Sequence, residues 1–178
     1  MKLFLVLLVI ICLFVAGAMG LVWSGVYNIA ANDPHWRITE WVLEETRERS
    51  VMVHSKGIEV PSQTDQRLLD IGFEHYNAMC LLCHNAPGYT RTEISRGLYP
   101  SPPDFGKIET ELPGEAQLFW IARNGIKMTG MPAFGSTHSE EELWGIVHFV
   151  RGLSKLKRDE YDAMVKTITT HKGTGHHH

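Results

Sequence analysis

Two cysteines and a histidine lie within five consecutive residues, Cys80-Leu81-Leu82-Cys83-His84. Two thiols separated by two residues on a helical turn can each add to one vinyl group of a porphyrin, and the imidazole that follows can bind its iron. A thioredoxin-like redox pair would need a βαβ context, and a zinc site would need a second pair of ligands at zinc-like spacing. The sequence shows neither, so it predicts one covalently attached haem c at Cys80, Cys83 and His84.

A haem iron bound by His84 has a second axial position, which a methionine or a histidine can fill. Met131 lies in Gly130-Met131-Pro132, a loop in which a flexible thioether can reach into a pocket and proline stiffens the chain after it. Met128, three residues earlier, is its main competitor. Packing or surface exposure accounts for the other candidates, which are His54, His75, His138, His148, Met52 and Met79. Met131 is therefore the predicted distal ligand.

An apolar run of 21 residues, Leu3–Trp23, contains no charged side chain. As a helix it would extend about 30 Å, which matches the hydrocarbon core of a bilayer. Lys2 precedes the run and Asp33 is the first charged side chain after it, so the positive-inside rule places Met1 in the cytoplasm. A cleaved signal peptide is the alternative, because Ala16-Gly17-Ala18 fits a signal peptidase site. The run continues past that site, which favours a retained single-pass anchor.

The composition excludes some classes of function. A net charge of −3 argues against a nucleic-acid partner, because no strongly basic face is implied. A hydrophobic content of 44% is enough for a packed core without disulfide bonds, and the three cysteines provide no disulfide framework. The C-terminal sequence ends in three histidines, which resembles an affinity tag; a natural metal-binding tail is the alternative.

Residues 24–62 are predicted to form a juxtamembrane helix and a linker. Asp33 followed by Pro34 is a typical helix start, and no glycine or proline follows until Gly57, so a helix is expected from Asp33 to Val53. Ile38, Trp41 and Val42 give it a narrow apolar stripe. This helix is predicted either to dock on a membrane partner or to cover part of the following domain.

Residues 63–158 are predicted to form a compact all-α domain, because no segment alternates with the period of a strand. Helices are expected at 64–80, 115–124 and 139–153, and Ser139 with Glu142 forms a capping box at the start of the last one. Residues 159–178 are predicted to form a C-terminal tail, in which 161–170 add one or two helical turns.

The stretch from Thr64 to Leu156 resembles a class I c-type cytochrome. The resemblance rests on Gly72-x-x-x-Tyr76 before the C-x-x-C-H motif, on Gly130-Met131-Pro132 47 residues after His84, and on the closing helix. It implies an all-α fold around the haem, with His84 and Met131 as axial ligands and a close crossing of the first and last helices at Gly72. It also implies that a proline carbonyl accepts the second N–H of His84, and three prolines are available: Pro100, Pro102 and Pro103.

These observations together predict an electron-transfer protein rather than an enzyme. It would be a monohaem cytochrome c in the inner membrane of a bacterium, anchored by Leu3–Trp23, with its haem domain in the periplasm. Its partners would be redox proteins in or at the membrane, and it would act in a respiratory chain as a carrier or as the haem c subunit of an oxidoreductase. The alternative is a haem enzyme or gas sensor with a labile distal ligand.

Overall fold

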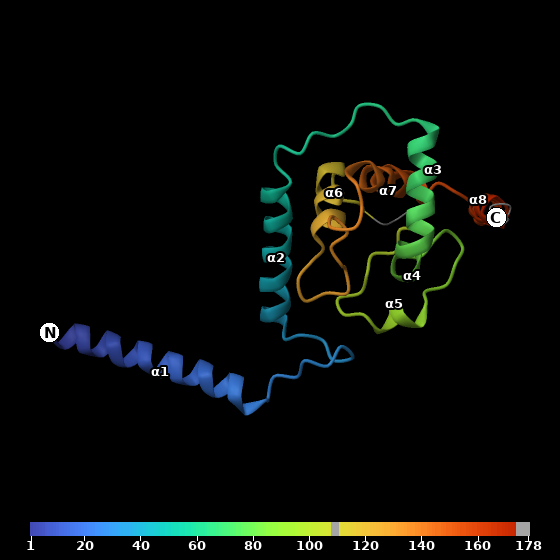
Figure 1. Cartoon of the computed structure of the whole chain (residues 1–178). Helices are drawn as coiled ribbons and strands as arrows, with labels where there is room; N and C mark the ends of the chain where they lie inside the picture. Colours follow the sequence, from blue (N-terminus) through green and yellow to red (C-terminus); the bar gives the residue numbers. More distant parts are fainter. Residues whose placement is uncertain (108–110, 174–178) are drawn as a thin grey trace. The chain divides into compact units, whose positions relative to one another are not determined.

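The computed structural model describes residues 1–107 and 111–173, with side chains up to residue 168 in these ranges. The described residues form helices and no strand, which confirms the predicted all-α class. The chain divides into two compact units, Met1–Glu40 and Trp41–His178. Figure 1 labels the helices along the chain.

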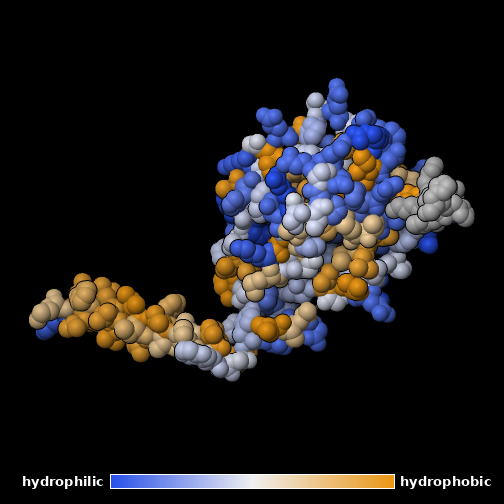
Figure 2. Space-filling model, viewed as in Figure 1, coloured by the Kyte–Doolittle hydropathy of each residue, from blue (hydrophilic) through white to orange (hydrophobic). Residues whose placement is uncertain are grey.

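The first unit contains helix α1, Lys2–Ser24, which ends at Gly25 in the left-handed conformation (φ 65°). None of its side chains is buried within the protein, and Figure 2 shows its hydrophobic surface. Among the described residues it is the one helix long and apolar enough to cross a membrane. The predicted membrane span of Leu3–Trp23 therefore coincides with a continuous helix.

Helix α2 spans Arg37–His54. The sequence predicted Asp33 as the N-cap and Pro34 as the first helical residue, so the predicted start is three residues too early. The Asp33 carboxylate accepts a hydrogen bond from the side chain of Asn28 (2.9 Å), and the Asp33 N–H donates to the carbonyl of Ala30 (3.1 Å). Asp33 thus closes a turn before the helix instead of capping it.

The part of α2 that lies in the second unit is packed at its C-terminal end and exposed at Trp41 and Val42. Val51 in its last turn is buried, and the ring of His54 lies 5.6 Å from that of Trp120. Trp41 and Val42 remain 61% and 45% exposed. The last turn therefore packs on the domain, whereas Trp41 and Val42 of the predicted apolar stripe are exposed.

Besides most of α2, the described residues of the second unit form a continuous helical stretch and four further helices. Helix α3 (Gln66–His75) passes into a π-helical turn, η1 (Tyr76–Cys80), and then into α4 (Leu81–His84), close to the helix expected at 64–80. The further helices are α5 (Glu93–Gly97), α6 (Glu115–Asn124), α7 (Glu140–Leu153) and α8 (Arg158–Gly173). Helix α6 has the predicted bounds, and α7 begins at the predicted capping box of Ser139 and Glu142.

Helices α3 and α7 cross each other (Figure 1), and their closest contact is at two glycines. A Cβ atom added to Gly72 would overlap the carbonyl group of Gly145, and one added to Gly145 would lie 2.8 Å from the carbonyl oxygen of Leu68. The two backbones are therefore in direct contact, and no larger residue fits between them. This confirms the close crossing that the resemblance implied at Gly72.

Aromatic side chains fill the core around this crossing. Phe73 of α3 lies against Phe149 of α7 and Tyr161 of α8, both with ring centroids 5.4 Å apart. Tyr161 is fully buried, and its hydroxyl donates to the side chain of Asn77 (3.1 Å). The C-terminal residues thus form a 16-residue helix held by the core, longer than the one or two turns expected from the sequence. The three final histidines lie outside the described residues.

Candidate functional site

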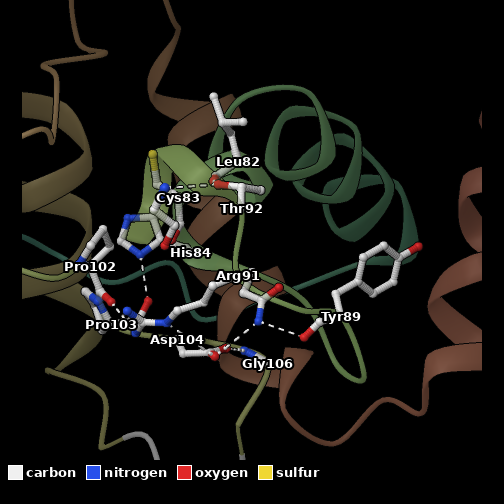
Figure 3. Close-up of polar contacts among 12 residues, drawn as sticks. Leu82, Cys83, His84, Tyr89, Arg91, Thr92, Pro102, Pro103, Asp104 and Gly106 are labelled. Atoms are coloured by element: carbon white, nitrogen blue, oxygen red, sulfur yellow. Dashed lines mark hydrogen bonds and ion pairs between the residues drawn. The ribbon is translucent and has the colours of Figure 1, made fainter. Parts of the chain in front are cut away.

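The C-x-x-C-H motif spans the end of η1 and the whole of α4. Two hydroxyl groups of the following segment hold this turn: Thr92 donates to the carbonyl of Leu82 (2.6 Å) and Ser95 to that of Cys83 (2.7 Å). Thr92 also caps α5 by accepting from the N–H of Ser95 (3.0 Å). Figure 3 shows the contact between Thr92 and the motif. The short helix α5 was not predicted from the sequence. Together with its capping residue Thr92, it holds the carbonyl groups of Leu82 and Cys83 in α4.

Both cysteines of the motif are free thiols in the chain. Cys80 is buried, whereas Cys83 is partly exposed. Burial, with a smaller contribution from Cys83, raises the pKa of the Cys80 thiol to about 12. The thiol of Cys80 is consequently protonated at neutral pH. The two thiols and the imidazole of His84 lie within two turns of one helical stretch.

The imidazole of His84 is oriented by a backbone carbonyl. Its Nδ1 lies 3.0 Å from the carbonyl oxygen of Pro103, and the ring of Phe105 stacks on it at 4.4 Å with an angle of 3°. A carbonyl can only accept, so Nδ1 carries the proton and Nε2 keeps its lone pair. The structure thus selects Pro103 among the three prolines that the sequence left open. Burial, chiefly, and the charge of Arg91 lower the pKa of His84, which favours the neutral imidazole that a metal requires.

A polar cluster lies next to His84 (Figure 3). The buried carboxylate of Asp104 accepts from the side chain of Asn85 (3.1 Å) and from the N–H of Gly106 (3.1 Å). The carbonyl of Asn85 accepts from the hydroxyl of Tyr76, whose pKa is raised by burial. Tyr76 therefore remains protonated and acts as a donor, a role that the sequence did not reveal because it depends on a contact nine residues away.

Met131 lies in a tightly closed loop between α6 and α7. The N–H of Ile126 donates to the carbonyl of Met131 (3.1 Å), and the N–H of Met131 lies 3.1 Å from the hydroxyl oxygen of Thr129. The backbone of Gly125 (φ 66°) lies so close to Pro132 that a Cβ atom would approach its carbonyl carbon to 2.7 Å. The backbone on both sides of Met131 is thus held in place.

The two competing methionines have different environments. Met128 is 97% exposed and has a left-handed backbone (φ 59°), whereas Met131 is partly buried. Gly130 lies against the side chain of Leu98, where a Cβ atom would come within 2.6 Å. Leu98 directly follows α5, which in turn holds the C-x-x-C-H turn through Ser95. A continuous set of contacts therefore links the Met131 loop to the motif.

The other histidines and methionines considered as distal ligands are accounted for by surface exposure or by contacts with neighbouring side chains. His75 is 3.3 Å from the Glu142 carboxylate, and its ring contacts that of His138 at 5.0 Å. His148 stacks on Trp144 (5.9 Å), and Met52 is exposed on α2. Met79 packs on the core beside the motif.

The residues of the motif fit a haem group. Two thiols separated by two residues, followed by a neutral imidazole whose Nε2 keeps its lone pair, are the donors that a haem c needs. A partly buried thioether in a supported loop supplies the kind of second ligand found in cytochromes c. An all-helical domain with a glycine crossing and this donor set defines the class: the chain is a c-type cytochrome.

Comparison with known proteins supports this class. Residues 67–150, just under half of the chain, match the family model of the cytochrome c oxidase, cbb3-type, subunit III. The family implies a haem c cofactor and a role in electron transfer. The matched range begins in α3 and ends in α7, so it includes the C-x-x-C-H motif and the Met131 loop.

Two further comparisons add little. No curated protein matches the chain. Among solved structures, a chain of the reducing HAO-like protein complex of Kuenenia stuttgartiensis is 21% identical, with a TM-score of 0.44. The match covers 52% of this chain and 47% of that one, so it spans about half of the length of either.

Proposed function

We propose that the protein carries one haem c, bound covalently through Cys80 and Cys83, and that it transfers single electrons. His84 and Met131 would be the two axial ligands. The observation that carries the proposal is the hydrogen bond from His84 Nδ1 to Pro103 (3.0 Å), because it leaves Nε2 as the nitrogen that can bind a metal. A bound haem would supply the chemistry of one-electron transfer between the ferrous and ferric states.

The two proposed axial side chains determine what the site can do. If His84 and Met131 both bound the iron, no coordination position would be open to a substrate. The thioether of Met131 would favour the reduced state of the iron and so raise its potential, while His84 is oriented by Pro103. This arrangement supports an electron carrier rather than an enzyme.

The location of the protein follows from its N-terminal helix in this proposal. Helix α1 would be a single-pass anchor in the inner membrane of a bacterium, with Met1 in the cytoplasm and the haem domain in the periplasm. Lys2 before the helix and the absence of positive charge directly after it support this orientation. Residues 24–62 would connect the anchor to the domain.

The proposed partners are redox proteins in or at the membrane, within a respiratory chain. Because the matched family is described as an oxidase subunit, the protein is proposed to act as a carrier or as the haem c subunit of a membrane oxidoreductase.

In the bacterium that expresses the protein, we expect the haem to be bound covalently and the protein to be in the membrane fraction. After cell fractionation, a denaturing gel stained for haem should show one band near 20.1 kDa in the membrane fraction, and acid-acetone extraction should not remove its colour. A C80S/C83S variant, which keeps His84, should lose the stained band because both proposed thioether bonds are missing. Stain lost on extraction would contradict covalent binding. A shorter stained protein in the soluble fraction would instead show cleavage after Ala18.

Electron transfer is tested by the reaction of the reduced protein with carbon monoxide. If Met131 fills the distal position, carbon monoxide at saturation should leave the visible spectrum of the dithionite-reduced protein unchanged. The M131A variant, with the position open, should form a carbon monoxide adduct and serves as the positive control. Rapid adduct formation by the unmodified protein would favour the gas-sensing or enzymatic alternative.

A further inference from the structure

We propose that Arg91 is a positioning residue for His84: it holds the Pro102–Pro103 backbone so that the Pro103 carbonyl stays aligned with Nδ1 of the imidazole. This inference rests on the proposed function, in which His84 is an axial ligand. Nothing in the sequence pattern marks Arg91, which lies seven residues after the motif.

The argument begins with the Pro102–Pro103 segment. A proline has no N–H, so neither residue can anchor its backbone by donating a hydrogen bond. Only the two carbonyl groups are available, and both accept. Pro102 accepts from Nη2 of Arg91 (2.8 Å), and Pro103 accepts from Nδ1 of His84 (3.0 Å). Figure 3 shows Arg91 and His84 approaching the same short segment.

Asp104 holds the guanidinium of Arg91 from the other side. Its carboxylate lies 3.9 Å from Nε of Arg91, and it is itself fixed by Asn85 (3.1 Å) and by the N–H of Gly106 (3.1 Å). The side chain of Asp104 is 5% exposed, so the carboxylate depends on these partners. The planar guanidinium faces a carbonyl and a carboxylate at once, which the single ammonium of a lysine cannot reproduce.

The position of the Pro103 carbonyl matters because this carbonyl accepts the hydrogen bond of His84, the proposed metal ligand. The acceptor at the second nitrogen of a ligating histidine sets the orientation and basicity of the imidazole, and such hydrogen bonds tune the potential of a haem. Loss of Arg91 would free the Pro102 carbonyl and remove a positive charge from beside Asp104. The His84–Pro103 bond should then open more often, and the nearby negative charge should favour the ferric state.

The experiment uses the full-length holoprotein in detergent, with variants R91M and R91K and the control R96M. Arg96 lies in the last turn of α5, and its side chain is exposed. NMR of the reduced protein measures the hydrogen exchange of the His84 Nδ1–H, and a redox titration measures the midpoint potential. In R91M, exchange should accelerate at least about tenfold, which equals about 1.4 kcal/mol in the opening equilibrium, and the potential should fall.

R91K separates positioning from charge. It keeps the cation but loses the fork, so its exchange should also accelerate, by about threefold or more, while its potential should move less than that of R91M. R96M should change neither quantity. If R91M fails to form a holoprotein, R91K alone decides the question.

Unchanged exchange in R91K, or in both variants, would overturn the positioning role. A change confined to the potential of R91M would assign Arg91 a charge effect only. If the proposed function itself is wrong, the unmodified protein will show no covalently bound haem on a stained gel, and this result is distinct from the outcomes for the Arg91 variants.

Discussion

Replacing Met131 with alanine is expected to abolish the near-infrared sulfur-to-iron charge-transfer band of the oxidised protein and to lower its midpoint potential. The thioether favours ferrous iron, so its loss stabilises the ferric state. We expect the equilibrium with a redox partner to shift by more than tenfold, which is roughly 59 mV for a one-electron couple. Absorption spectroscopy and a redox titration measure the two effects.

The matched control is M128A. Met128 is the nearest methionine, but it is 97% exposed, and both methionine and alanine must adopt the same left-handed backbone there (φ 59°). The band and the potential should therefore stay close to those of the unmodified protein. If M128A loses the band and M131A keeps it, the distal ligand is Met128.

Replacing Gly72 with alanine is expected to destabilise the haem domain by about 3 kcal/mol or more. The added Cβ atom would overlap the carbonyl of Gly145, and both groups belong to helix backbones that cannot rotate away. Helices α3 and α7 must then separate, which also loosens the contacts of Phe73 with Phe149 and Tyr161. Denaturant unfolding followed by tryptophan fluorescence measures the free energy of unfolding.

G152A provides the control for this measurement. Gly152 lies near the end of α7, and a Cβ atom there would meet nothing within 4 Å. Alanine has a higher helix propensity than glycine. The free energy of unfolding of G152A should therefore equal that of the unmodified protein or exceed it by up to about 1 kcal/mol. A G72A protein as stable as G152A would contradict the close crossing. Failure of G72A to accumulate while G152A accumulates normally would agree with it.

Local sequence was enough for the features that depend on neighbouring residues. The motif from Cys80 to His84 needs only the spacing of one helical stretch, α1 needs an uninterrupted apolar run, and α7 begins at a capping box of Ser139 and Glu142. Each depends only on residues that are consecutive in the chain, so the sequence predicts it directly.

The start of α2 shows where local rules fail. Asp33 and Pro34 form a good helix start, yet the Asp33 side chain is occupied by Asn28, and the helix begins at Arg37. An aspartate can cap a helix or close a turn with its own carboxylate, and the two uses compete. Which one prevails depends on a partner five residues away, and the capping pattern does not include that partner.

Tertiary structure decided the environment of the proposed axial residues. The sequence offered three prolines for His84, and only the folded chain brings the carbonyl of Pro103 to its Nδ1. Two methionines were available in one loop, and packing leaves Met128 exposed while Met131 is partly buried. The hydrogen bonds of Arg91 to Pro102 and of Tyr161 to Asn77 also join separate segments of the chain, and no sequence motif marks either pair. The donor types are fixed by the amino acids themselves, but their alignment depends on packing between segments, which no local pattern encodes.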